Sequence, residues 1–258
     1  MDLSNISLMS LPVLASFLLL ALLALAVLLR ANASSAVDAP AQPISVVINL
    51  SRRPDRMASF VKTYSASDFC DTELHRIEAV DGSNNTDWSR FLESEALERL
   101  VTMQRTGIRK AHPDLTPGAV GCYLSHVQAW IAIAESGAPY GFVFEDDAIL
   151  DSTSLQRFHK ARRTTPPEWD ILLMGYQAVG TLASPGVMKV QQFMGLFGYA
   201  ISADACRSLT RSVFPIRQQL DWELSQKIKD GEIDVYGVYP TNVRIQSFTT
   251  DIQTPVME

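Results

Sequence analysis

Three consecutive carboxylates, Glu145-Asp146-Asp147, follow the apolar run Tyr140–Phe144. The valine and aromatic residues of this run predict a buried strand. Three acids do not all ionise in an apolar interior without a partner, so we expect them at the strand's carboxyl end, facing water or a cation. Ligands bind at that edge of open α/β sheets, and carboxylates together with phosphate oxygens hold Mg²⁺ or Mn²⁺. The stretch predicts either a metal–diphosphate site or a solvated acidic turn, and taken alone it favours the turn.

Three arginines, Arg52, Arg53 and Arg56, stand where a first predicted strand, Ile44–Leu50, turns into a helix. Pro54 suits the first turn of that helix, which we expect to end near residue 65. Acids rather than bases are usual in a first turn, whereas the free backbone N–H groups there attract anions. The arginines therefore indicate an external anion such as a nucleotide phosphate. A solvated basic turn is the alternative, and this stretch alone supports both interpretations equally.

Asp81-Gly82 follows a second predicted strand, Leu74–Val80. An acid at this place accepts hydrogen bonds from a ribose or a base, and the glycine lets a ligand approach the backbone. An ordinary Asp-Gly turn is the alternative. The pattern G-x-G-x-x-G is absent, so the sequence does not indicate a dinucleotide.

A strong helix signal begins with Thr116 as the cap and Pro117 in the first turn, and it ends near Gly137. Ser125 and His126 lie beside the apolar stripe of this helix. A single histidine on a helix is more often packed and hydrogen-bonded than it is a ligand, so its position alone assigns it no role.

The remaining pattern alternates strands and helices, which predicts an α/β fold with a mainly parallel sheet. The further predicted helices cover residues 88–102, 151–163, 203–212 and 221–229, with Asp221 as a candidate N-cap. The further predicted strands cover residues 169–175, 187–193, 198–202 and 233–239. Residues 104–115 suit a mobile loop, and the tail after residue 239 reads as irregular.

Composition narrows the function further. The 258 residues are 47% hydrophobic and carry a net charge of −6, so a nucleic acid is not expected as the main partner. The three cysteines, Cys70, Cys122 and Cys206, form no C-x-x-C pair, and Cys122 reads as a buried structural thiol. The four histidines are widely scattered, so a zinc site is not expected.

An uncharged run over residues 8–29 is long enough to cross a bilayer as a helix. It follows a short tail over residues 1–7 and precedes a flexible tether over residues 30–43. We expect a signal anchor, with a cleaved signal peptide ending at Ala31-Asn32-Ala33 as the alternative. The sequons Asn32-Ala33-Ser34 and Asn84-Asn85-Thr86 suit a type II protein with its domain in the Golgi or ER lumen. Arg30 instead suits a bacterial inner-membrane enzyme that faces the cytosol.

These motifs, in this order, resemble those of glycosyltransferase family 25, which includes bacterial lipopolysaccharide galactosyltransferases and animal collagen-directed galactosyltransferases. The likeness covers roughly residues 44–251, leaving 252–258 as a tail. It is carried by Ile48-Asn49-Leu50, Arg52-Arg53-Pro54-Asp55-Arg56, Asp81-Gly82, Thr116-Pro117-Gly118, Gly121-Cys122, Ser125-His126, Phe144-Glu145-Asp146-Asp147, Gly198–Ser202, Asp221-Trp222-Glu223 and Tyr239-Pro240.

The resemblance implies a single Rossmann-like nucleotide-sugar transferase domain of the GT-A type. It implies an inverting enzyme that uses a UDP-sugar, most often UDP-galactose, with Mn²⁺ as the cation and Mg²⁺ as the alternative. The partners would be the nucleotide sugar, a glycan or glycoprotein acceptor, and a membrane reached through the N-terminal helix. Collagen is not carried over as the acceptor.

Roles for the site residues follow from the resemblance and from the chemistry of each side chain. The metal would be held by Asp147 with help from Glu145 or Asp146. Asp146 is also assigned to the catalytic residues. The nucleotide would contact Asn49, Arg52, Arg53, Arg56, Asp81, Gly82, Ser125 and His126. The base that takes the acceptor's proton would be Asp221, with Glu223 second and Asp170 third.

Three other functions fit parts of the pattern. A catalytically inactive, membrane-anchored adhesion or scaffold protein would keep the fold and lose donor and cation binding. A metal-dependent phosphatase would need acids in a D-x-D arrangement, whereas the acids here are contiguous. A binding module would bind sugar without turning over any donor.

Overall fold

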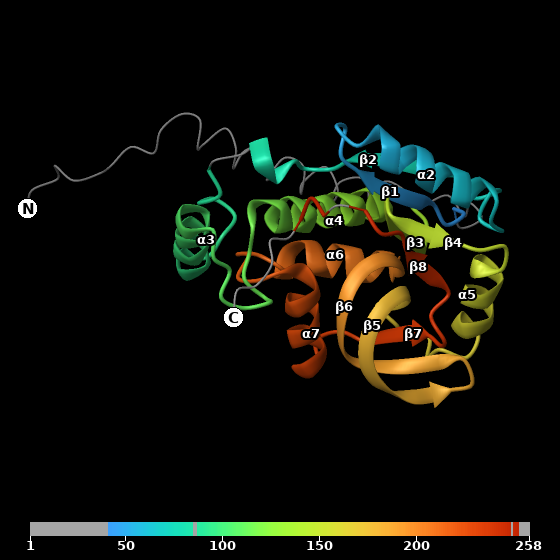
Figure 1. The fold of residues 1–258 in the computed structure, drawn as a ribbon. Coiled ribbons are helices and arrows are strands. Elements are labelled where there is room, and N and C mark those ends of the chain that lie inside the picture. The colour runs from blue at the N-terminus through green and yellow to red at the C-terminus, as the bar shows by residue number, and fades with distance from the viewer. Residues whose placement is uncertain (1–40, 85–86, 249, 253–258) are drawn as a thin grey trace, which may run out of the picture. The chain divides into compact units, whose positions relative to one another are not determined.

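Six strands form the central sheet, in the order β2-β1-β3-β6-β5-β7. We describe it from a computed structural model that places residues 41–84, 87–248 and 250–252 (Figure 1). The strands are β1 (Ser45–Asn49), β2 (Leu74–Glu78), β3 (Tyr140–Glu145), β5 (Ile171–Ser184), β6 (Val187–Ser202) and β7 (Val235–Val238). Five of them run in one direction and β6 runs against them, as the pairings show. The predicted α/β fold with a mainly parallel sheet is confirmed.

Helices cover both faces of this sheet. They are α2 (Pro54–Ser65), α3 (Ser94–Thr106), α4 (Pro117–Glu135), α5 (Ser154–Arg162), α6 (Ala203–Ser212) and α7 (Leu220–Lys229), with a short 3₁₀ helix, η1 (Gly82–Asn84). Apolar residues of α2 and α5 pack in one core cluster. Those of α3, α4, α6 and α7 pack in the other. The side chains of β1 are buried on both faces of the sheet, because Val47 packs in the first cluster while Val46 and Ile48 pack in the second.

The two helices that border the acidic and arginine-rich motifs follow their local signals. α2 has Pro54 in its first turn, as predicted. Thr116 caps α4, since its hydroxyl accepts a hydrogen bond from the backbone N–H of Ala119. α4 ends at Glu135, and Gly137 follows with a positive φ of 76°.

The structure corrects several element boundaries. The strands predicted over 187–193 and 198–202 are one strand, β6, which forms with an extended β5 the long curled hairpin in Figure 1. The helix predicted from residue 88 begins at Ser94. Gln219, not Asp221, caps α7. The tail predicted as irregular contains β8 (Val243–Ile245), which pairs with β4 (Ala148–Leu150) just after the acidic triplet.

The predicted span over residues 8–29 lies outside the described residues, as does the tether up to residue 40. Among the residues that the structure does describe, no helix has the length and apolar character needed to cross a membrane.

Candidate functional site

The acidic triplet lies at the carboxyl edge of the sheet, as predicted. Glu145 ends β3, and Asp146 and Asp147 form the turn before β4. β1 and β3 are parallel neighbours with Ile48 opposite Glu145, so the end of β1 and the start of α2 lie beside the triplet. β2 is also parallel to β1, which brings Asp81 to the same edge.

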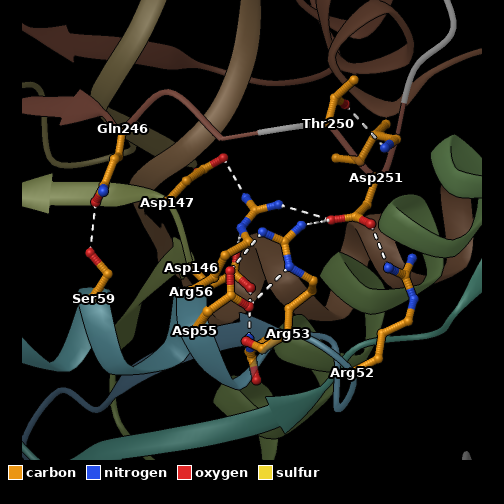
Figure 2. A network of polar contacts seen from close by, with 12 residues as sticks. Arg52, Arg53, Asp55, Arg56, Ser59, Asp146, Asp147, Gln246, Thr250 and Asp251 are labelled. Atoms are coloured by element: carbon orange, nitrogen blue, oxygen red, sulfur yellow. Dashed lines mark hydrogen bonds and ion pairs between the residues drawn. The ribbon is translucent and has the colours of Figure 1, made fainter.

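Arg56 joins the arginine turn to the triplet. Its guanidinium is buried, with Nε 2.7 Å from Asp146 Oδ1 and Nη2 2.5 Å from Asp147 Oδ2. Its Nη1 lies 3.3 Å from Oδ2 of a fourth acid, Asp251. Figure 2 shows the guanidinium pointing between these carboxylates. The two predicted halves of the site, basic and acidic, are therefore one ion-pair network.

Asp251 is the centre of the basic half, and no sequence motif marks it. Arg52 donates from Nη1 to Asp251 Oδ1 at 2.5 Å, and Arg53 donates to the other oxygen (Figure 2). Burial raises the pKa of Asp251, but hydrogen bonding and charge from Arg52 and Arg53 hold it below its ordinary value. The anion expected at these arginines is thus supplied, in this structure, by the chain's own carboxylate.

The segment that carries Asp251 is anchored to the start of α4. The hydroxyl of Thr116 donates to the backbone carbonyl of Ile252. Gly118 leaves room for this approach, because a Cβ there would lie 2.3 Å from the carbonyl oxygen of Asp251. The ring of Phe248 lies 5.2 Å from the guanidinium carbon of Arg56 and adds a cation–π contact.

Asp147 has the electrostatics of a cation ligand. Burial and the charge of Glu145 raise the pKa of Asp147 to about 7, against the opposing charge of Arg56. Its Oδ2 pairs with Arg56, whereas its Oδ1 is buried and has no hydrogen-bond partner among the described residues. A buried carboxylate oxygen without a partner is costly, and a divalent cation would supply one. Asp147 and Glu145 therefore fit the predicted metal.

Two cavities meet at this network. The inner pocket is lined by Arg52, Asp81, Gly82, Ser125, Asp146 and Asp251, among others. The outer cleft is lined by His126, Asp147, Gln177, Met194, Asp221 and Trp222, among others. Both are lined by Arg56, Cys122, Glu145, Asp251 and Ile252, which stand at their junction. Such an arrangement suits one ligand that spans both cavities.

Three of the predicted nucleotide contacts also have structural roles. Asn49 is buried, and its amide donates to Asp146 Oδ2 at 2.7 Å, so it orients that carboxylate. The hydroxyl of Ser125 donates to the carbonyl of Gly121 and accepts from the N–H of Val80. At Gly82, a Cβ would lie 1.8 Å from the carbonyl oxygen of Pro117, so the close approach of α4 requires a glycine here.

Asp81 and His126 keep side chains at the cavities. Asp81 Oδ2 lies 2.8 Å from Arg52 Nε, and hydrogen bonds from Ser83 and then Arg52 lower the pKa of Asp81. His126 is almost fully buried, and its Nε2 lies 3.3 Å from Glu145 Oε1. Asp81 is therefore placed for a polar ligand in the inner pocket, and His126 belongs to the triplet's surroundings.

The three candidate bases differ in whether they reach the outer cleft. Asp221 faces the outer cleft and accepts from the N–H of Gly195 at 3.1 Å, and burial raises its pKa. Glu223 is buried against Arg217, 3.1 Å away, and does not line the cleft. Asp170 precedes β5 and so lies at the amino edge of the sheet, where it accepts from the N–H of Asp234. Asp170 was a wrong candidate, and the geometry favours Asp221 over Glu223.

Comparison with known proteins agrees with this arrangement. A family model described as "Glycosyltransferase family 25 (LPS biosynthesis protein)" matches residues 42–182, more than half of the chain. The chain belongs to glycosyltransferase family 25.

Individual relatives are distant. The human protein named "Inactive glycosyltransferase 25 family member 3" is 28% identical over 185 residues, covering 67% of this chain and 29% of the relative. Human "Procollagen galactosyltransferase 2" is 25% identical over 175 residues, covering 63% and 26%. "Lacto-N-neotetraose biosynthesis glycosyltransferase LgtB" of Neisseria gonorrhoeae is 36% identical over 77 residues, covering 29% and 27%. The matches span less than a third of each of these relatives.

The family 25 match covers part of the site. It includes the arginine turn, Asp81 and the acidic triplet, whereas Asp221 and Asp251 lie beyond residue 182. Sequence reasoning found Asp221 through its motif and missed Asp251, since no local pattern marks an acid in a tail as a partner of arginines about 195 positions earlier. It also assigned no ligand role to Cys122, which the fold places beside His126 and Glu145.

Proposed function

We propose that this chain is an inverting glycosyltransferase that moves a hexose, with UDP-galactose as the first donor to test, to a hydroxyl of a glycan, lipopolysaccharide or glycoprotein acceptor. One observation carries the proposal. Three arginines and three consecutive acids of a family 25 chain meet at the carboxyl edge of the sheet, at the junction of two cavities. That juxtaposition is what a nucleoside diphosphate with a divalent cation needs.

The donor's diphosphate would take the place of the Asp251 carboxylate on Arg52, Arg53 and Arg56. A carboxylate and a phosphate present the same kind of paired oxygens to a guanidinium, so one substitutes for the other without rearranging the arginines. Asp81, at the inner pocket, would accept hydrogen bonds from the ribose or the uracil. Donor binding would thus require the segment that carries Asp251 to move away.

The cation would be held by Asp147 and Glu145, with Asp146 fixed by Arg56 and Asn49. When bound, it offsets the negative charge that grows on the departing diphosphate. Mn²⁺ is the first ion to test and Mg²⁺ the second.

Asp221 would take the proton from the acceptor hydroxyl across the outer cleft. Burial raises its pKa, which makes the carboxylate a stronger base than an exposed aspartate. Its two backbone hydrogen bonds, from Gly195 and Trp222, hold the carboxylate in place. A positioned base of this kind contributes about 10²–10⁴-fold to a rate.

The test is UDP binding and donor hydrolysis by the full chain, with UDP-galactose, UDP-glucose, UDP-N-acetylglucosamine and GDP-mannose, each in Mn²⁺ and in chelator. Metal-dependent release of UDP from one donor is the expected result. Arg52→Gln should weaken UDP binding, while Arg90→Gln, which alters an arginine that lines neither cavity, should not. Hydrolysis that persists undiminished in chelator would refute the metal assignment.

A second candidate is a catalytically inactive, transferase-like scaffold protein. It is favoured by one finding, since human, rat, bovine and mouse relatives that match this chain carry names that include the word inactive. This candidate predicts that the folded chain binds neither UDP nor a divalent cation. Binding of UDP without turnover of any donor would leave a nucleotide-binding protein that has lost catalysis.

The signal anchor over residues 8–29 and the lumenal location stay predictions. A glycan on Asn32 would place that residue in the lumen, so glycosidase treatment of the wild type and of Asn32→Gln tests them together.

A further inference from the structure

Cys122, His126 and Glu145 bring three different metal-binding groups to one point. Cys122 and His126 are four positions apart on α4 and so lie on the same side of that helix. Glu145 approaches from the end of β3. The cysteine Sγ, a histidine ring nitrogen and a glutamate oxygen all lie within 4.8 Å of one another. No other group of three such ligands occurs among the described residues.

His126 is held as a ligand would be. Its Nδ1 lies 2.9 Å from the hydroxyl oxygen of Tyr199, and Trp130 Nε1 donates a hydrogen bond to the same oxygen at 2.8 Å. Both partners are fully buried, so they fix the plane of the imidazole. Because Tyr199 contacts Nδ1, the other ring nitrogen, Nε2, is the one that faces Glu145. Histidines that bind metals have a partner of this kind on the second ring nitrogen.

The surroundings of the three groups favour a cation. All three line the outer cleft, and so do Asp147 and Asp221. The carboxylates of Glu145, Asp147 and Asp221 give this cleft a negative field, which favours a divalent cation.

Cys206 shows what a structural thiol looks like in this fold. It is fully buried in the apolar cluster of α4, α6 and α7, and no pair of metal ligands accompanies it in the part of the chain that the structure describes. Cys70 is exposed. Cys122 differs from both, because it reaches a cleft and has an imidazole and a carboxylate beside it.

We propose that Cys122, His126 and Glu145 form a three-ligand site for a thiolate-preferring divalent cation of the zinc type, with its fourth position open to the outer cleft. Thiolate and imidazole select Zn²⁺ over Mg²⁺, and three protein ligands with one open position are typical of sites where zinc also binds a water or a substrate oxygen. The widely spaced histidines gave no reason to expect zinc, but the fold supplies the missing ligands from one helix and one strand.

This site goes beyond the proposed transferase activity, since it stands whether or not the chain turns over a donor. Glu145 is shared with the hard-cation site at Asp147. A zinc-type ion on Cys122 and His126 would therefore withdraw Glu145 from Asp147. The chain would discriminate between cations through the one carboxylate that both sites need.

Cobalt binding tests the site by a signal that does not depend on activity. Co²⁺ bound to a thiolate in a four-coordinate site gives an intense near-ultraviolet charge-transfer band and visible bands, and Zn²⁺ abolishes both on displacing it. We expect the full chain to bind Co²⁺ stoichiometrically. Cys122→Ser should lose the charge-transfer band, and His126→Gln should bind Co²⁺ more weakly. Cys70→Ser and Cys206→Ala are the matched controls, and both should keep the band. Mg²⁺ in excess should leave it unchanged.

The absence of a charge-transfer band in folded wild-type protein would overturn the proposal, and so would a band that survives Cys122→Ser or disappears in Cys70→Ser. Near-ultraviolet circular dichroism confirms that each variant is folded. Asp147→Asn separates this site from the proposed function. If donor hydrolysis in Mn²⁺ is lost while the cobalt band remains, the two sites are distinct. If the wild type shows the band but hydrolyses no donor, the transferase proposal fails and the zinc-type site stands.

Discussion

Replacing Asp251 by asparagine should tighten UDP binding while it destabilises the fold. In the structure the Asp251 carboxylate pairs with Arg52, Arg53 and Arg56, the same three groups that would hold the donor's diphosphate. Asparagine keeps the shape and one acceptor oxygen but removes the charge. The variant protein therefore loses ion pairs, and the incoming diphosphate no longer has to displace a competing anion.

The size of both effects follows from the exposure of the three arginines. Their side chains are 44%, 17% and 7% exposed for Arg52, Arg53 and Arg56, so the pair with Arg52 is discounted for solvent screening. Exchanging a charged for a neutral acceptor costs about 1 kcal/mol for each of the two better-buried pairs. A total of about 2 kcal/mol corresponds to a Kd for UDP that is roughly 30-fold lower. It also corresponds to a Tm that is roughly 4–8 °C lower for a domain of this size.

Isothermal titration calorimetry with UDP in Mn²⁺, together with thermal unfolding without ligand, measures both quantities. Asp55→Asn is the matched control, because Asp55 pairs with Arg53 from an exposed position and lines neither cavity. Its Kd for UDP should stay within about threefold of the wild type. A weaker affinity for UDP in Asp251→Asn would refute the reasoning, since it would mean that Asp251 helps to bind the donor or its cation.

Three further predictions concern the other residues of the site. Asp221→Asn should lower the rate of transfer at least ~100-fold and remove the acidic limb of the pH–rate profile, while Glu223→Gln should retain transfer. Because burial raises the pKa of Asp221, that limb in the wild type should lie above the ordinary range of an aspartate, with activity lost as pH falls through it. Asp147→Asn should abolish metal-dependent donor hydrolysis without lowering the Tm, since its ionised form is the one that burial penalises; an active variant would end the metal assignment. Gly82→Ala should cost about 1–3 kcal/mol of unfolding free energy in denaturant titration, because its Cβ would overlap the carbonyl of Pro117.

Local signals predicted the parts of this fold that are locally determined. Pro54 fixed the start of α2, and Thr116 with Pro117 fixed the start of α4, because caps and first-turn prolines act within a few residues. The triplet was predicted at the carboxyl edge because three adjacent carboxylates need water or a cation, which they reach only where the buried strand leaves the core. These elements carry most of the candidate site.

What sequence reasoning missed depends on contacts that are distant along the chain. β8 pairs with β4 about 95 positions earlier, and a strand of three residues leaves too short a pattern to identify. The hairpin of β5 and β6 is interrupted by register shifts, which break the alternation that marks a strand. Asp170 is a different kind of error, because its position before the strand was already visible in the sequence. An acid that precedes a strand lies at the opposite edge from acids that follow parallel strands, so Asp170 and Asp147 never shared an edge.

The charge balance at the sheet edge links the cation to the donor. Without ligands, five carboxylates face three arginines at this edge: Asp81, Asp146, Asp147 and Asp251 pair with the arginines, and Glu145 lies beside His126. The diphosphate of a nucleotide sugar carries more negative charge than the Asp251 carboxylate it would replace, so the exchange alone would deepen the imbalance. A divalent cation at Asp147 and Glu145 offsets that added charge and supplies the partner that Asp147 Oδ1 lacks. Cation and donor would therefore favour each other's binding, and by linkage the coupling has the same size in both directions. An ion drawn to Cys122 and His126 would weaken this coupling through Glu145, since one carboxylate cannot complete both sites at once.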